Sequence, residues 1–140
     1  MRKFIVDTNV LFSALAKIGI SRLLFVISPF EFYMPEYSIQ EVRKYEKFIL
    51  EKSWLTKDGF ETLFYSVVDK INVVKEKEYA SFIERADRII GNIDKNDVPF
   101  VALALSFTNE GIWTDDSGFE KQSNVRVWKT SDILNLLAGD

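Results

Sequence analysis

The stretch that decides the fold is Lys3-Phe4-Ile5-Val6-Asp7-Thr8-Asn9, an apolar run followed at once by a carboxylate and two small polar residues. A short Phe-Ile-Val run is typical of a buried strand in a parallel sheet. In such sheets ligands bind outside the carboxyl ends of the strands, which is where Asp7 would lie. The stretch therefore predicts a ligand-binding rim at this end of the sheet.

Strand-like and helix-like segments alternate along the rest of the chain. Apolar runs predict further strands at 31–34, 71–74, 111–114 and 125–128. Helical spacing of apolar residues predicts helices at 8–16, 21–27, 36–52, 57–68, 76–90, 98–105 and 132–138. We therefore expect an α/β fold, a three-layer sandwich whose central, mainly parallel sheet of about 4–5 strands is flanked by helices.

Length and composition favour one globular domain, 1–140, with one core. The absence of cysteine excludes disulfides, thiolate zinc sites and cysteine nucleophiles, and the absence of histidine removes the commonest general base. Any catalysis must therefore rely on carboxylates, lysines or hydroxyls. Any bound metal is expected to be a hard ion that prefers oxygen ligands.

The net charge of −3 argues against a protein that binds nucleic acid over its whole surface, although a local basic patch remains compatible with it. The N-terminus lacks the apolar segment and small-residue cleavage site of a signal peptide. No segment approaches the roughly 18 consecutive apolar residues of a membrane span. We therefore expect a cytoplasmic protein without a membrane partner.

Five carboxylates are candidates for one site, four of them at the end of a predicted strand or the start of a predicted helix and one beside the apolar stripe of a helix: Asp7, Asp97, Asp115, Asp116 and Glu41. Asp7 and Asp97 each have an ordinary alternative role as the N-cap of the following helix. Asp115 and Asp116 follow a strand as Asp7 does, which puts them on the same rim if the strands are parallel. Glu41 lies beside the apolar stripe of its helix, where a carboxylate is costly to desolvate unless it meets a cation.

A divalent cation would explain why such acids gather. Converging carboxylates repel one another and raise each other's pKa values unless a cation neutralises them. Mg²⁺ or Mn²⁺ is expected, because these ions favour carboxylate oxygens and can promote hydrolysis of phosphate esters. Hydrogen bonds from Thr8, Asn9 and Ser117 are expected to hold the carboxylates or their waters in place.

Four segments together resemble the four acidic motifs of PIN domains, in the same order and over nearly the whole chain: 4–11, 35–42, 94–104 and 113–119. The resemblance implies a three-layer PIN-like fold and a metal-dependent ribonuclease with Mg²⁺ or Mn²⁺ at its acidic cluster. It also implies assembly as a homodimer. Many members are toxins of the VapC type, which implies a possible antitoxin partner, but the Asp-x-x-Asp run of 94–97 is similar to a branch not necessarily tied to toxin operons.

By this resemblance the catalytic, metal-binding residues are Asp7, Glu41, Asp97 and Asp116. Asp116 takes the last place because the family pattern runs threonine, any residue, aspartate, two more residues and phenylalanine. Asp115 falls on the variable position and is a further candidate to share the metal.

Contacts with RNA phosphates are expected from basic residues near the acids: Lys17, Arg22, Arg43, Lys44 and Lys47. For each of them a solvated helix face is the ordinary alternative. Two other functions stay open. One is a non-catalytic module with the same fold that binds RNA or a protein. The other is a haloacid-dehalogenase-like phosphatase, which needs a second aspartate where this chain has Asn9.

Overall fold

Five parallel strands form the centre of the molecule. They are β1 (Lys3–Val6), β2 (Glu31–Pro35), β3 (Ile71–Val74), β4 (Gly111–Trp113) and β5 (Val127–Trp128). Their order across the sheet is β3-β2-β1-β4-β5, and every neighbouring pair is parallel. The structure is a computed structural model that describes residues 1–139. The expected mainly parallel sheet is thus confirmed, and it is parallel throughout.

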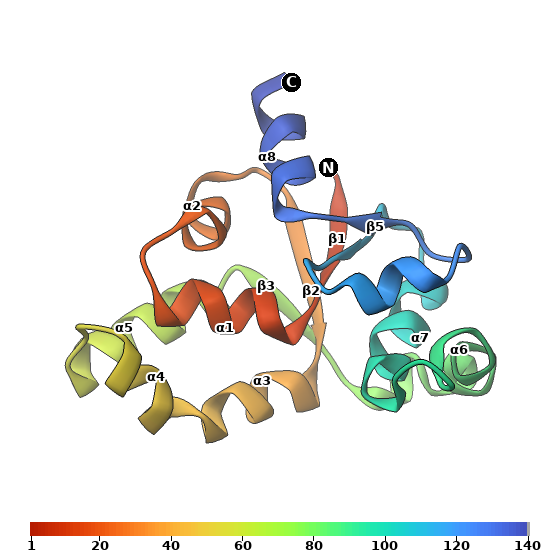
Figure 1. The fold of residues 1–140 in the computed structure, drawn as a ribbon, viewed down its shortest axis with the longest axis horizontal. Helices are drawn as coiled ribbons and strands as arrows, with labels where there is room; N and C mark the ends of the chain where they lie inside the picture. Colours follow the sequence, from red (N-terminus) through yellow and green to blue (C-terminus); the bar gives the residue numbers. More distant parts are fainter. Residues whose placement is uncertain (140) are drawn as a thin grey trace.

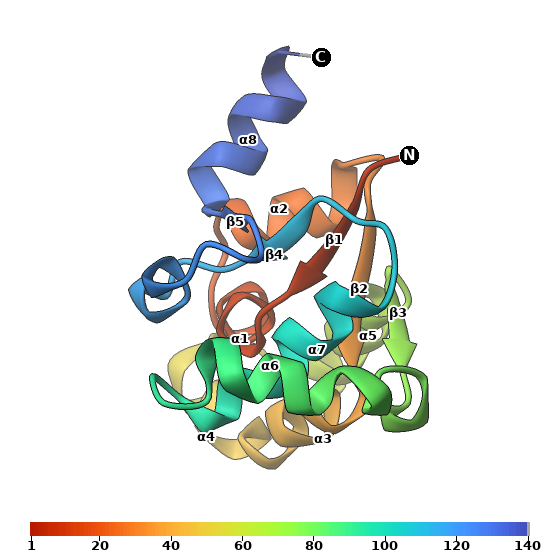
Figure 2. The same cartoon turned by 90° about the vertical axis from the view of Figure 1, so that its right-hand side faces the viewer.

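Helices cover both faces of this sheet and make the three layers that were expected (Figures 1 and 2). The helices are α1 (Thr8–Ala16), α2 (Ile20–Ile27), α3 (Glu36–Lys44), α4 (Glu46–Lys52), α5 (Lys57–Val68), α6 (Ile83–Ile90), α7 (Val98–Ser106) and α8 (Thr130–Gly139). Figure 1 shows α1 to α5 on one side of the strands and α6 and α7 on the other.

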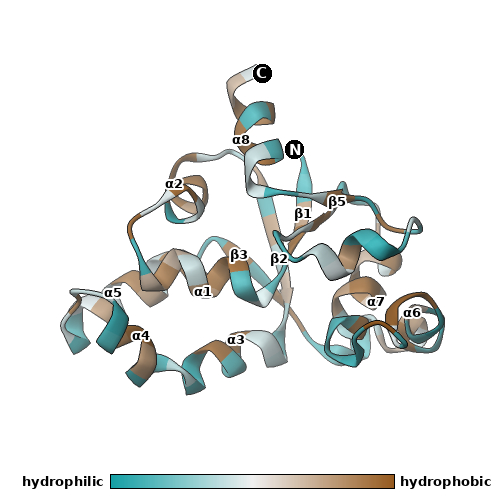
Figure 3. Cartoon of the chain, in the orientation of Figure 1, coloured by the Kyte–Doolittle hydropathy of each residue, from teal (hydrophilic) through white to brown (hydrophobic). Residues whose placement is uncertain are grey.

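Alternating side chains of the strands build two apolar clusters, one on each face of the sheet, instead of the one core that was expected. Phe4 and Val6 of β1 join the cluster under α1, α2 and α5, whereas Ile5 joins the cluster under α6 and α7. A strand buried on both faces needs apolar residues at successive positions, which explains the uninterrupted Phe-Ile-Val run. The helix α7 is mostly apolar in colour in Figure 3, while α3, α4 and α5 alternate between apolar and polar colours.

The helix predicted over 36–52 is wrong in one respect, because it is divided at Tyr45. Tyr45 has φ −96° and ψ 13°, which ends α3 and begins α4. The bend places the rings of Tyr45 and Phe48 against Phe12 of α1, with centroids 6.3 and 5.9 Å away. Tertiary packing therefore overrides a regular helical spacing of apolar residues.

The helix predicted over 76–90 is also shorter than expected. Two 3₁₀ turns, η1 (Glu76–Glu78) and η2 (Ala80–Phe82), precede α6. Residues three apart lie one above the other in 3₁₀ geometry, so Tyr79 and Phe82 both face the core formed with α7. Two further 3₁₀ segments, η3 (Lys95–Asp97) and η4 (Ser117–Lys121), carry or follow predicted acids.

Across residues 1–139, no single helix has the length and apolar character needed to span a membrane. The α1 and α2 pair reaches that length only as two segments bent by 100°.

Candidate active site

A cavity of about 520 Å³ lies where β1 and β4 end. Its lining residues are Asp7, Thr8, Asn9, Tyr37, Glu41, Tyr45, Asp94, Asn96, Asp97, Phe100 and Asp116. They come from the β1–α1 junction, α3, the η3–α7 junction and the segment after β4. The structure therefore brings the four acids Asp7, Glu41, Asp97 and Asp116 around one cavity at the rim that the first strand predicts.

Asp7 is the most enclosed of these acids. It is 5% exposed and occupies the N-cap position of α1, but its side chain makes no well-formed capping hydrogen bond there. Its N–H donates to the Trp113 carbonyl at 3.0 Å, which ties the end of β1 to β4. Burial raises the pKa of Asp7, and the charge of Asp116 adds to the rise, while the Thr114 hydroxyl opposes it.

Thr114 holds two of the acids in position, a role that sequence reasoning missed. Its buried hydroxyl donates to Asp7 Oδ2 at 2.8 Å and accepts from the Asp116 N–H at 3.0 Å. The threonine was visible as the first residue of the family pattern, but nothing local in the sequence shows that it contacts Asp7. Thr114 is therefore the link between the acid after β1 and the acid after β4.

Asp97 lies at the start of α7 and is only 7% exposed. Its side chain makes no capping hydrogen bond; Asp94 caps the preceding η3 segment by accepting from the Asn96 N–H at 2.9 Å. Burial raises the pKa of Asp97 to about 7, with further contributions from the charges of Asp94, Asp7 and Asp116. Its Oδ2 is buried without a hydrogen-bond partner among residues 1–139.

Glu41 and Asp116 lie at the more open side of the cavity. Glu41 has a 42% exposed side chain, and its Oε1 accepts from Lys44 Nζ at 2.8 Å. Asp116 is exposed, and its Oδ1 accepts from the Gly118 N–H at 2.9 Å. Of the four acids, only Glu41 has an ion-pair partner within the described part of the chain.

Two sequence candidates are not brought to the cavity. Both oxygens of Asp115 accept from Thr130, one from its N–H at 2.9 Å and one from its hydroxyl at 2.6 Å. Asp115 therefore secures the start of α8 instead of facing the other acids. Ser117 begins η4 and does not line the cavity, whereas Thr8 and Asn9 do.

Three of the five basic candidates are engaged by the protein itself. Arg22 donates to the carbonyls of Ala14 and Leu15, at 2.7 and 3.2 Å, and so completes the end of α1. Arg43 pairs with Glu46 and Glu61, and Lys44 pairs with Glu41. The other two candidates, Lys17 and Lys47, are exposed and do not line the acidic cavity.

The acids surround the cavity without forming a compact ligand set. Within residues 1–139, no group of three carboxylates is close enough to hold one ion in the arrangement described. The donor chemistry nevertheless fits a hard divalent ion, because the cavity offers carboxylate oxygens and the buried Asp97 Oδ2 lacks a partner.

The comparison with protein families identifies the chain. The family model described as PIN domain matches residues 5–138. The chain belongs to the PIN domain family, and its fold is of a nuclease type. No curated protein matches the chain.

Proposed function

We propose that this chain is a divalent-metal-dependent nuclease that hydrolyses RNA phosphodiester bonds. The observation that carries the proposal is the Oδ2 of Asp97, which is buried without a hydrogen-bond partner among residues 1–139 although Asp97 lines a cavity together with Asp7 and Asp116. A buried carboxylate without a partner is costly, and the cost is relieved when a cation binds. PIN domains typically use divalent metals, in keeping with this interpretation.

Asp7, Asp97, Asp116 and Glu41 are the side chains that would hold Mg²⁺ or Mn²⁺. When bound, such an ion neutralises the acids, polarises a phosphoryl oxygen and lowers the pKa of a water molecule. Glu41 has to release Lys44 to take part, and this costs little because solvent screens an exposed ion pair.

The other side chains of the cavity have roles that follow from their contacts. Thr114 fixes the relative position of Asp7 and Asp116. Asp116 and Glu41, which are the more exposed acids, are suited to accept a proton from the attacking water. Tyr37 and Tyr45 line the open side, where aromatic rings can stack on an unpaired base, and this favours a single-stranded substrate.

Incubation of the protein with a fluorogenic single-stranded RNA and Mn²⁺ tests the proposal. Asp7→Asn should lower the cleavage rate by about 100-fold or more, because loss of one ligand removes several kcal/mol of transition-state stabilisation. EDTA should abolish cleavage. Asp69→Asn, an exposed carboxylate outside the cavity, is the matched control and should leave the rate unchanged.

The outcomes separate the competing functions. Cleavage that persists equally in Asp7→Asn contradicts the proposed site. RNA binding without cleavage supports the non-catalytic module, and release of phosphate from small monoesters supports the phosphatase. Assembly as a homodimer and pairing with an antitoxin stay predictions. Light scattering on the purified protein measures whether it is a dimer.

A further inference from the structure

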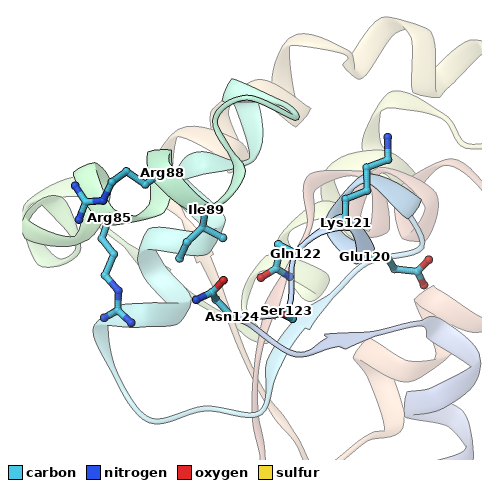
Figure 4. Close-up of a pocket in the computed structure, with 8 residues that line it drawn as sticks. All are labelled: Arg85, Arg88, Ile89, Glu120, Lys121, Gln122, Ser123 and Asn124. Atoms are coloured by element: carbon cyan, nitrogen blue, oxygen red, sulfur yellow. The ribbon is translucent and has the colours of Figure 1, made fainter.

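A second cavity, of about 640 Å³, carries mostly positive charge although the chain as a whole is acidic. Its lining residues are Arg85, Arg88, Ile89, Glu120, Lys121, Gln122, Ser123 and Asn124. Figure 4 shows the two arginines extending from α6 on one side and Lys121 on the other, with Ser123 and Asn124 between them. Three cations and one carboxylate therefore surround a space lined otherwise by amides, a hydroxyl and one aliphatic side chain.

The cations of this cavity are largely available to a ligand. Within residues 1–139, neither Arg85 nor Lys121 has an ion-pair or hydrogen-bond partner. Arg88 pairs with Glu84 at 3.5 Å, but both side chains are mostly exposed, so that pair is weak. The one carboxylate, Glu120, is directed to Lys129 at 3.4 Å. By contrast, Arg22 and Arg43 are engaged within the fold.

The loop that forms one wall is held in shape before any ligand binds. The Gln122 side chain donates to the carbonyls of Phe119 and Val125, at 2.9 and 2.8 Å, and accepts from the Val125 N–H at 2.9 Å. Phe119 and Val125 are buried in the core beside α6. The loop therefore presents Ser123 and Asn124 on a fixed backbone, which lowers the entropic cost of binding.

Both walls of the basic cavity are connected along the chain to residues that line the acidic cavity. Lys121 ends the η4 segment that Asp116 precedes, and α6 leads through a short turn to Asp94 and Asp97. At a rise of about 2 Å per residue in 3₁₀ geometry, Lys121 lies on the order of 10 Å from Asp116. A single nucleic-acid strand with a rise of about 3.4 Å per nucleotide covers that distance in three nucleotides.

We infer that the Arg85–Arg88–Lys121 cavity binds backbone phosphates of a single-stranded RNA a few nucleotides away from the phosphodiester in the acidic cavity. This inference rests on the proposed nuclease function. Arginine and lysine provide charge-assisted hydrogen bonds to phosphate oxygens, and a locally positive cavity attracts a polyanion even though the whole chain has a net charge of −3. The cavity thereby sets the direction in which the RNA leaves the acids.

Binding of a labelled single-stranded RNA, followed by fluorescence anisotropy in EDTA, tests the inference without any cleavage. The double variant Arg85→Gln/Lys121→Gln should raise Kd by about 10-fold at 0.1 M salt. Two lost phosphate contacts should also reduce the slope of log Kd against log salt by about 1.4. Lys57→Gln/Lys70→Gln removes the same charge from exposed positions at the ends of α5 and should change Kd by less than about twofold.

The inference is overturned if both double variants weaken binding equally, if neither does, or if an oligoglutamate peptide binds the unsubstituted protein more tightly than the RNA. The melting temperatures of the unsubstituted protein and the two double variants should agree within about two degrees, because exposed substitutions rarely affect stability. Failure of the proposed nuclease activity would appear in the cleavage assay and would leave this binding result unaffected.

Discussion

Asp97 is the residue at which stability and the proposed chemistry conflict most directly. Its carboxylate is 7% exposed, one oxygen has no partner among the described residues, and three neighbouring aspartates oppose its ionisation. A residue that served only to begin α7 would use its side chain as a cap, and this one does not. Perturbed carboxyl groups of this kind are typical of functional sites.

Asp97→Asn is expected to stabilise the metal-free protein at neutral and higher pH. The pKa of Asp97 is about 7 in the native state against 3.8 as the ordinary value. A carboxyl group whose pKa is raised in the native state makes its full contribution to stability at pH values below its ordinary pKa of 3.8. That contribution is lost as the pH rises through the native pKa of about 7. The asparagine of the variant does not ionise, so the variant does not lose this stability. Its free energy of unfolding should therefore exceed that of the unsubstituted protein by an amount that grows from pH 4 to 7 and reaches about 1–2 kcal/mol.

Urea denaturation in EDTA at a series of pH values measures this difference. Asp69→Asn, which replaces an exposed carboxylate, serves as the control and should show no such trend. An advantage of Asp97→Asn that is independent of pH would contradict the prediction.

The sequence locates the acids better than it locates their partners. Asp7, Glu41, Asp97 and Asp116 could be found because each stands at a strand end, at a helix start or beside an apolar stripe. The role of Thr114 could not, because its hydroxyl contacts Asp7 across 107 positions of the chain. Likewise, no local pattern shows that Arg22 donates hydrogen bonds to the carbonyls at the end of α1.

At the scale of the elements, β4 brings the acid that follows it close to the acid that follows β1. It lies between β1 and β5, and it leads directly to Thr114 and Asp116. Gly111, its first residue, has φ +124°, and a Cβ there would lie 2.1 Å from the Arg126 carbonyl oxygen. Both the backbone conformation and the close approach of Arg126, the residue just before β5, require glycine at this position.

Gly111→Ala is therefore expected to destabilise the protein by about 2–4 kcal/mol, because the methyl group clashes with backbone that cannot move freely. Urea denaturation measures the loss. Gly139→Ala is the matched control, since an added Cβ there meets nothing within 4 Å. Equal effects of the two substitutions would show that the close contact at Gly111 has no energetic consequence.

Helix boundaries were the least predictable feature at this scale. The apolar spacing of 36–52 and 76–90 continues through the breaks at Tyr45 and Tyr79, so the sequence pattern does not reveal them. The breaks arise from packing: Tyr45 meets Phe12, and buried Tyr79 belongs to the core formed with α7. Both contacts join residues that are distant along the chain.

For the whole molecule, the main expectation concerns Mn²⁺ and thermal stability. An ion that binds only the native state contributes about 2.7 kcal/mol at 100 times its Kd, which corresponds to a rise in Tm of roughly 5–10 °C for a chain of this size. Because the pKa of Asp97 is about 7, protons compete with the ion at pH 5.5. The rise should therefore be larger at pH 8 than at pH 5.5.

Differential scanning calorimetry at both pH values measures the effect, with Asp7→Asn as the variant that should lose most of it. A rise of equal size at both pH values, or one that Asp7→Asn retains, would indicate that the ion binds elsewhere.

The fold class could be predicted because strands buried on both faces leave uninterrupted apolar runs between amphipathic helices. The order of the strands could not, since alternation alone does not say that the fourth strand inserts beside the first. That insertion also has a consequence during protein synthesis. The partner that β1 needs on one side, and the hydroxyl that holds Asp7, are translated more than a hundred residues later. A nascent chain therefore emerges with its acids unassembled, and the cavity that they line cannot form until the segment through Asp116 has been released.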